Sequence, residues 1–137
     1  MGLVRASIYL DSCLAIYLIE ENSAFASQLE KTLEANLDSA LCISPLTEME
    51  CLIMPLREQN ELLIAKFEKW FGTIAVLTIN SAIFYKAARL RADFSSLKTP
   101  DALHLATALD HNCDEFWTND NRLNGVAPSL VKNILTT

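Results

Sequence analysis

The chain alternates short, continuously apolar runs with longer segments whose apolar residues recur every three or four positions. The apolar runs lie at 7–11, 40–44, 74–79 and 115–118, and a further candidate lies at 131–135. Runs of this length, rich in β-branched and aromatic residues, predict short buried strands. Because they are apolar throughout and do not alternate with polar residues, they favour a parallel sheet that is covered on both faces.

The segments between these runs predict helices. We expect helices at 12–22, 22–39, 45–59, 60–72, 80–94 and 100–112. The clearest amphipathic pattern is in 22–39, where Phe25, Leu29, Leu33 and Leu37 recur at every fourth position. Ser23 is the expected N-cap of that helix, since its hydroxyl can accept a backbone hydrogen bond.

Strands and helices alternate along the whole chain, which is typical of the α/β class. We therefore predict a three-layer α/β/α fold with a central parallel sheet of four or five strands. Residues 1–137 contain no linker-like stretch, low-complexity segment or internal repeat, so we expect one domain. In such sheets ligands bind beyond the carboxyl ends of the strands.

Composition excludes several classes of protein. The 137 residues are 51% hydrophobic and 20% charged, which excludes a disordered chain. No apolar run approaches the roughly 18–20 residues that span a bilayer, and the first residues do not form a signal-peptide pattern. We expect a cytoplasmic protein with no membrane association. The four cysteines include no C-x-x-C pair, so their favoured interpretation is as small buried hydrophobes, with a redox role as the alternative.

Four acids stand where predicted strands end or helices begin: Asp11, Glu50, Asp101 and Asp120. Each has an ordinary structural interpretation, respectively as a helix cap, a solvated helix residue, a favourable charge at a helix N-terminus and a turn residue. If all four meet at one sheet edge, they repel one another unless cations neutralise them. An oxygen-only ligand set suits Mg²⁺ or Mn²⁺, and such ions can activate water for phosphodiester hydrolysis.

Four segments carry a resemblance to a known family. "IYLDSCLAIYLIE", "ISPLTEMECLIMPLR", "TPDALHLATAL" and "FWTNDNRL" resemble, in this order and at this spacing, the signature segments of PIN-domain ribonucleases. They are most similar to the VapC-type toxins of bacterial toxin–antitoxin pairs, and the similarity extends from about Ile8 to Leu123. The resemblance implies an endoribonuclease with a Mg²⁺ or Mn²⁺ site, an RNA substrate, an antitoxin partner and a homodimer.

The resemblance also assigns roles to residues. Asp11, Glu50, Asp101 and Asp120 match the four catalytic and metal-binding acids, with Glu48 as a second choice for the second acid because it points about 200° around the helix from Glu50. Ser12 matches a polar neighbour of the first acid, and Thr118 matches a hydroxyl residue that supports the fourth. The net charge of −6 departs from the basic character usual in nucleic-acid binders, although cation-binding acids contribute to that count.

Basic residues flank two of the acids. Lys86, Arg89, Arg91 and Lys98 precede Asp101, and Arg122 follows Asp120. They are candidates for contacts with RNA phosphates, and a solvated helix face is the alternative.

Two further residues and the apolar helices allow more than one interpretation. His104, one turn after Asp101, is interpreted as a buried hydrogen-bonded histidine, with a proton donor to the leaving oxygen as the alternative. Trp117 is assigned to the core. Apolar surface on the N-terminal helices and on 62–71 suits a homodimer or an antitoxin helix.

The competing functional hypothesis is a catalytically silent PIN-like module that binds a protein partner. A haloacid-dehalogenase-type phosphatase fits less well, because Cys13 stands where a second Asp is usual. The sequence lacks the acidic pair and the late Lys of a receiver domain. It also lacks the glycine-rich turn of a dinucleotide-binding protein.

Overall fold

The computed structural model describes residues 5–21 and 24–135. Within them, five parallel strands form one sheet in the order β3-β2-β1-β4-β5. The strands are β1 (Ser7–Leu10), β2 (Ala40–Ile43), β3 (Ala75–Val76), β4 (Glu115–Thr118) and β5 (Val131–Asn133). At the centre, Tyr9 of β1 is in register with Cys42 of β2 and Phe116 of β4.

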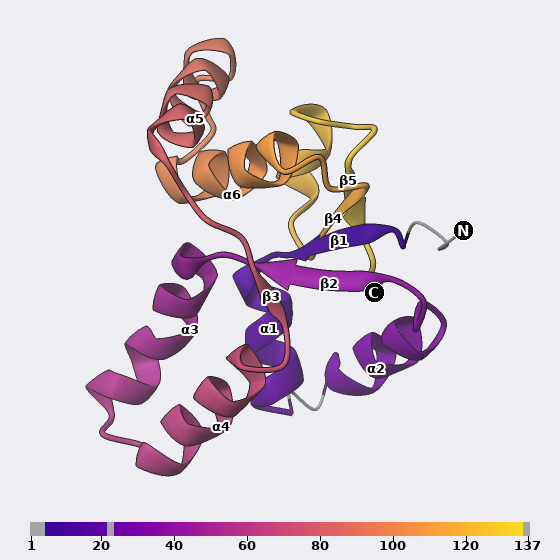
Figure 1. Ribbon diagram of the computed structural model, residues 1–137, viewed down its shortest axis with the longest axis vertical. Helices are drawn as coiled ribbons and strands as arrows, with labels where there is room; N and C mark the ends of the chain where they lie inside the picture. The colour runs from indigo at the N-terminus through magenta and orange to yellow at the C-terminus, as the bar shows by residue number, and fades with distance from the viewer. Residues whose placement is uncertain (1–4, 22–23, 136–137) are drawn as a thin grey trace.

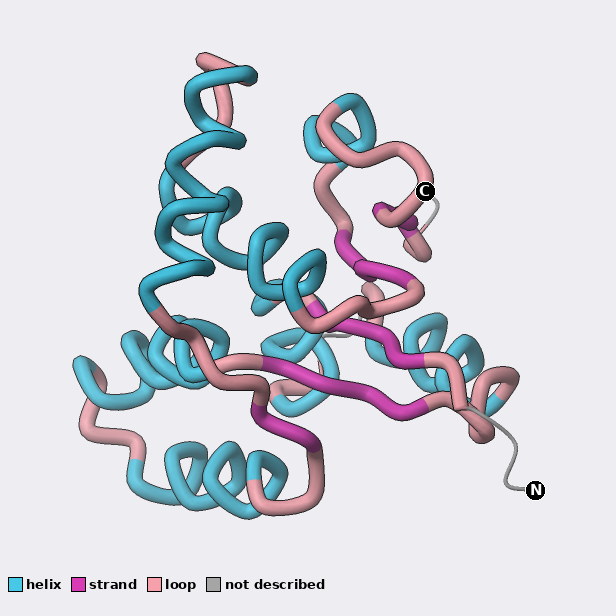
Figure 2. Tube along the Cα trace, turned by 45° about the horizontal axis from the view of Figure 1, so that its top comes forward, coloured by secondary structure: helices cyan, strands magenta, loops and turns pink. Residues whose placement is uncertain are grey.

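Helices cover both faces of this sheet (Figures 1 and 2). They are α1 (Ser12–Ile19), α2 (Ala26–Glu34), α3 (Pro45–Arg57), α4 (Glu61–Phe71), α5 (Ser81–Asp93) and α6 (Thr99–Asp110), followed by the 3₁₀-helix η1 (Asn121–Gly125). The first four lie on one face, and α6 lies on the other with α5 packed against it. The predicted three-layer α/β/α fold with a parallel sheet is confirmed.

The central strands are buried on both sides, which explains their uninterrupted apolar sequences. Tyr9 and Phe116 point towards α6 and stack with their ring centroids 5.3 Å apart. Leu10 and Trp117 point to the opposite face, where they pack in the cluster that contains Phe67 of α4. Trp117 is therefore a core residue, as expected.

Two predicted elements are shorter than their sequence pattern indicates. Helix α2 ends at Glu34, where the Asn36 side-chain amide donates to the Thr32 carbonyl (2.7 Å) and the chain turns towards β2. Leu37, predicted on the buried face, is consequently 74% exposed. The predicted cap Ser23 lies outside the described residues.

The second difference concerns the run at 74–79. It was predicted as a buried strand, but it contributes the two exposed residues of β3. Strand β3 lies at the edge of the sheet and pairs with β2 alone. Edge strands in natural sheets are often very short.

The helix following β2 starts as the sequence predicts. Pro45 occupies the first helical position of α3, and Ser44 and Thr47 form a reciprocal capping box. This start fixes the direction of α3 at the carboxyl end of β2, which is where a ligand site is expected in a parallel sheet. Among the described residues, no helix combines the length and apolarity needed to cross a bilayer.

Candidate functional site

Asp11 directly follows β1 and is held by groups from two neighbouring elements. Its Oδ1 accepts a hydrogen bond from the Ser12 backbone N–H (2.8 Å), and its Oδ2 accepts one from the Thr118 hydroxyl (2.7 Å). Its own N–H donates to the Trp117 carbonyl of β4 (2.9 Å). With 8% of its surface exposed, Asp11 is both the N-cap of α1 and a positioned carboxylate.

Thr118 joins the first and fourth of the predicted acids. Its buried hydroxyl donates to Asp11 and accepts the Asp120 backbone N–H (3.0 Å). The Asp120 carboxylate accepts hydrogen bonds from Arg122 through both oxygens, at 2.9 Å to Nε and 2.6 Å to Nη2. This paired guanidinium lowers the pKa of Asp120, so the Asp120 carboxylate is ionised at neutral pH.

Asp101 reaches the same region from the opposite helical layer. It lies in the first turn of α6, and a cavity of about 370 Å³ is lined by Asp11, Asp101 and Asp120. Ser12, Cys13, Tyr17 and Asn119 complete the lining of this cavity. Partial burial raises the pKa of Asp101, and the nearby charges of Asp11 and Asp120 raise it further. Three predicted acids thus share one cavity and repel one another.

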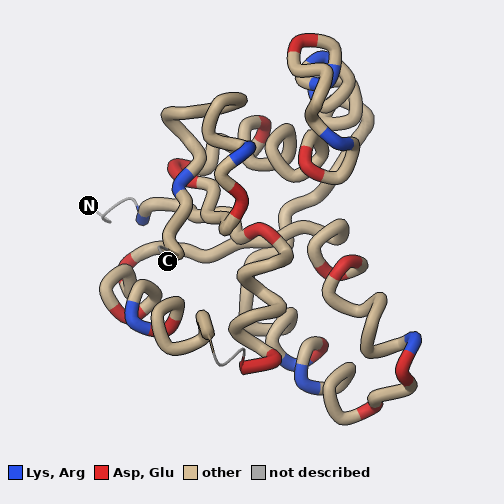
Figure 3. Tube along the Cα trace, turned by 180° about the vertical axis from the view of Figure 1, so that it is seen from behind, with Lys and Arg blue, Asp and Glu red and all other residues tan. Residues whose placement is uncertain are grey.

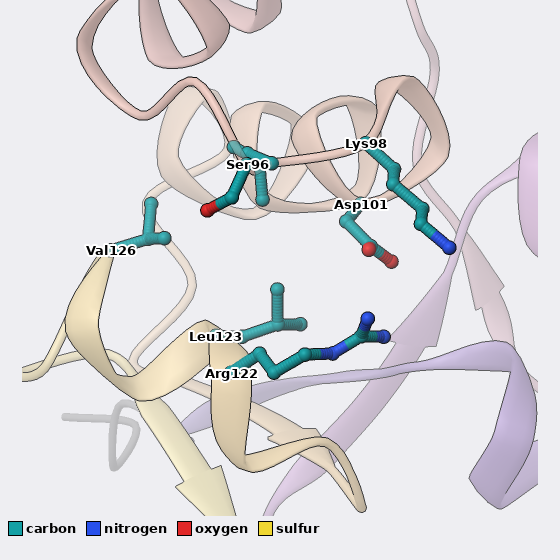
Figure 4. Close-up of a pocket in the computed structure, with 7 residues that line it drawn as sticks. Ser96, Lys98, Asp101, Arg122, Leu123 and Val126 are labelled. Carbon is teal, nitrogen blue, oxygen red and sulfur yellow. The ribbon is translucent and has the colours of Figure 1, made fainter.

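A smaller hollow of about 150 Å³ adjoins Asp101 and holds positive charge. Its lining comprises Ser96, Leu97, Lys98, Asp101, Arg122, Leu123 and Val126. In Figure 4 the Asp101 carboxylate lies between the ends of the Lys98 and Arg122 side chains. Carboxylates and positively charged side chains therefore lie side by side at the carboxyl edge of the sheet.

Glu50 is not among the residues that line the cavity of the other three acids. It lies on α3, and its Oε1 hydrogen-bonds Nε2 of the buried His104. On the other side of the ring, His104 Nδ1 hydrogen-bonds the Tyr9 hydroxyl (2.6 Å), which also contacts Ser44 Oγ (2.7 Å). His104 is thus a buried hydrogen-bonded histidine in this structure.

The Tyr9 hydroxyl is the centre of this buried network. It also lies 3.3 Å from Thr47 Oγ1. Burial raises the pKa of Tyr9, so the phenol keeps its proton. The network connects the core of the sheet to the carboxylate of Glu50, and it fixes where that carboxylate lies.

The donor chemistry of the cavity suits a hard divalent cation such as Mg²⁺ or Mn²⁺, which prefers carboxylate oxygens. Yet within residues 5–21 and 24–135 no three His, Cys, Asp or Glu side chains are arranged as a metal site. Both oxygens of Asp120 are engaged by Arg122, and Glu50 is engaged by His104. For all four acids to bind a cation, Asp120 would have to release Arg122 and Glu50 would have to release His104.

The basic residues of α5 lie apart from the acids. Lys86 pairs with Asp110 (3.1 Å), and Arg89 lies over the Tyr85 ring. Arg91 donates to the Leu97 carbonyl in the connection between α5 and α6 and to the Thr99 hydroxyl at the start of α6. Figure 3 shows acidic and basic positions interspersed along the trace, without one continuous basic stripe.

Several residues of the site were not singled out from the sequence. Tyr17 and Asn119 line the cavity, and Tyr9 and Ser44 complete the network of His104. Ser44 could have been found through the capping box that it forms before Pro45. Nothing in the sequence assigned Tyr9 to the site, because a tyrosine in a continuously apolar strand is predicted to be an ordinary core residue.

Comparison with known proteins gives the family. The family model of the PIN domain matches residues 8–127. The fold is similar to a chain of a toxin–antitoxin complex from Klebsiella pneumoniae, with 23% identity, a TM-score of 0.78 and coverage of 95% of this chain and 99% of that one.

Two further solved structures resemble the chain. One is VapBC2 from Rickettsia felis bound to a promoter DNA fragment, with 16% identity, a TM-score of 0.74 and coverage of 93% and 98%. The other is VapC20 from Mycobacterium tuberculosis, a sarcin–ricin-loop-cleaving toxin, with 13% identity, a TM-score of 0.74 and coverage of 88% and 95%. A comparison with curated proteins gave no significant match. Since the family model covers most of its length, the chain belongs to the PIN-domain family.

Proposed function

We propose that the protein is a Mg²⁺- or Mn²⁺-dependent endoribonuclease and the toxin of a type II toxin–antitoxin pair. The observation that carries the proposal is that Asp11, Asp101 and Asp120 line one cavity of a PIN-domain chain. The raised pKa of Asp101 supports it, because the other two carboxylates contribute to that shift. Such mutual repulsion is what a bound cation relieves.

We assign each residue of the site a role in the proposed reaction. Asp11 and Asp101 would hold the cation, with Asp120 and Glu50 as further ligands. When bound, the ion would supply a water of lowered pKa and stabilise charge on the phosphate. Thr118 positions Asp11, since its hydroxyl is buried and donates to that carboxylate. Lys98 and Arg122 would bind RNA phosphates beside the acids.

An antitoxin partner is supported by the solved relatives, several of which are described as toxin–antitoxin complexes. The chain itself offers a groove of about 340 Å³, in which Ile19, Leu62 and Leu63 lie beside the polar residues Glu20, Asn60 and Lys66. Leu62 in this groove is 88% exposed. An amphipathic antitoxin helix could cover such a surface with its apolar face.

The alternative is a catalytically silent PIN-like module that binds a protein partner. It is favoured by the present pairing of Asp120 with Arg122 and of Glu50 with His104, which withholds two acids from a cation. The two hypotheses differ in whether a divalent cation enables RNA cleavage.

The deciding experiment incubates the purified protein with single-stranded and stem–loop RNAs in Mg²⁺, in Mn²⁺ and in EDTA. We expect cleavage in either cation and none in EDTA, because metal-activated water supplies the nucleophile. Cleavage that persists in EDTA would refute the metal-dependent mechanism. Absence of cleavage under every condition, together with binding of an antitoxin encoded upstream, would establish the silent module.

We also predict a homodimer. Phe84 and Tyr85 of α5 are 57% and 65% exposed, and Met49, Ile53 and Leu56 of α3 are exposed as well. Pairing of two copies would remove this apolar surface from water, as in most soluble oligomers with two-fold symmetry. Light scattering at micromolar concentration should give twice the chain mass of 15.3 kDa. A species of 15.3 kDa alone would contradict the prediction.

A further inference from the structure

Two cysteines that are distant in sequence meet beneath α6. Cys42 of β2 and Cys113, in the connection between α6 and β4, place their sulfurs 3.7 Å apart across 71 residues. Cys42 is buried in the cluster between the sheet and α6, and Cys113 packs against that cluster while keeping partial exposure. Neither residue lines the acidic cavity.

The two thiols differ in ways that suit an attacking and a resolving role. Hydrogen bonds from the Cys42 thiol and from Ser7, with the nearby His111, lower the pKa of Cys113 to about 7. The pKa of Cys42 is raised by the same interaction and by burial. Cys113 is therefore the accessible thiolate, and thiolates are the nucleophilic form of cysteine.

The remaining two cysteines provide an internal comparison. Cys51 is buried, and Cys13 is partly buried. The sulfur–sulfur contact described here joins Cys42 with Cys113 and involves neither of these two residues.

We propose that Cys42 and Cys113 form an intramolecular disulfide when the protein meets a hydroperoxide such as hydrogen peroxide. The Cys113 thiolate attacks one oxygen of the peroxide, the O–O bond breaks, and hydroxide leaves to give a sulfenic acid. The Cys42 sulfur then attacks the sulfenic sulfur, forming the S–S bond and releasing water. In total two thiols and one hydrogen peroxide give one disulfide and two waters.

The two sulfurs are already in van der Waals contact. The sulfurs must approach by about 1.7 Å to reach the bond length of about 2.05 Å. The link would join β2 to the amino end of β4 across the central strand, closing a loop that spans 71 residues. Because closing a long loop restricts the unfolded chain, we expect the oxidised protein to melt roughly 5–15 °C higher than the reduced one.

The test treats the full-length reduced protein with equimolar hydrogen peroxide at pH 7.5 or so and counts free thiols. We expect the count to fall from four to two per chain, with the loss of two hydrogen atoms from the intact mass. Peptide mapping without reductant should show one cross-linked pair containing Cys42 and Cys113. Cys13→Ser and Cys51→Ser are the matched controls and should form the same link.

Two variants isolate the chemistry. Cys42→Ser should stop at the Cys113 sulfenic acid, which dimedone traps as a single adduct. Cys113→Ser, at a partly exposed position, should retain its fold, keep all its remaining thiols and melt at the same temperature with or without peroxide. The proposal is overturned if peroxide leaves all four thiols free, if the link involves Cys13 or Cys51, or if it joins two chains. It is also overturned if oxidation lowers the melting temperature.

Discussion

Asp101→Asn is expected to abolish metal-dependent RNA cleavage while preserving the fold. The substitution keeps the size of the side chain but removes one of three charges that line the cavity. Changes to residues that only orient metal ligands already lower metal affinity or activity by about 10–100-fold, so the loss of a direct ligand should exceed about 100-fold. Cleavage rates of a fixed RNA in Mg²⁺, for variant and wild type purified in parallel, measure the effect.

Asp110→Asn is the matched control for this substitution. Asp110 is the last residue of the same helix, and its carboxylate pairs with Lys86 on the exposed surface. Removing such an exposed pair should cost at most about 1 kcal/mol of folding free energy. The variant should cleave at the wild-type rate.

Melting curves give the Asp101→Asn prediction a second readout. Burial and the neighbouring acids raise the pKa of Asp101 in the folded protein, so the folded state holds this proton more tightly than the unfolded state. The ionised carboxylate therefore destabilises the fold. Wild-type stability falls as the pH rises from the pKa of Asp101 in the unfolded chain through its higher pKa in the folded protein. Without metal at neutral pH, the variant should melt a few degrees higher, and the difference should vanish once acid protonates the wild-type carboxyl.

Saturating Mg²⁺ should reverse that order. The wild type gains stability by binding the ion, about 2.7 kcal/mol at a hundredfold excess over Kd, and the variant does not. A folded Asp101→Asn protein that cleaves RNA as fast as wild type would refute the proposed nuclease site. An unfolded variant, identified by circular dichroism, would show instead that Asp101 is needed for the fold.

Tyr9→Phe is expected to destabilise the protein by about 1–3 kcal/mol. The Tyr9 hydroxyl contacts His104 Nδ1, Ser44 Oγ and Thr47 Oγ1, all in the buried interior. Its removal leaves these polar atoms with fewer partners while the ring and its stacking on Phe116 remain. Thermal or urea unfolding should show the loss, equivalent to a fall in Tm of roughly 3–12 °C.

Tyr85→Phe removes a hydroxyl from an exposed tyrosine and serves as the control. That hydroxyl accepts a hydrogen bond from Arg89 (3.1 Å), but water can replace it. We expect a change below about 0.5 kcal/mol. If Tyr9→Phe is no more destabilising than Tyr85→Phe, the network around His104 does not contribute to the stability of the fold.

The sequence predicted the parts of the fold that depend on local pattern. Continuous apolar runs identified β1, β2 and β4, because strands covered on both faces have no polar side to reveal. The starts of α3 and α5 followed from Pro45 and Asn80, whose effects on a helix N-terminus are local. The carboxyl-edge rule for parallel sheets placed Asp11 and Asp120 at the same edge.

The sequence did not predict the hydrogen-bond partners of the acids that are distant along the chain. Glu50 hydrogen-bonds His104 across 54 residues, and it is not among the residues that line the cavity of the other acids. Likewise, the exposure of β3 depends on its place at the sheet edge, which an apolar run alone does not specify. In both cases tertiary packing selected among contacts that local pattern allowed.

The position of β1 also bears on how the protein is made. Of the five described strands, β1 leaves the ribosome before the other four and lies at the centre of the sheet, with β2 on one side and β4 on the other. Thr118, which holds Asp11, follows it by 107 residues. During synthesis one edge of β1 therefore stays open until late, and an open strand edge invites non-native pairing. A product that terminates before Thr118 would contain Asp11 without the hydroxyl that positions it, so only translation through β4 yields the assembled acidic edge.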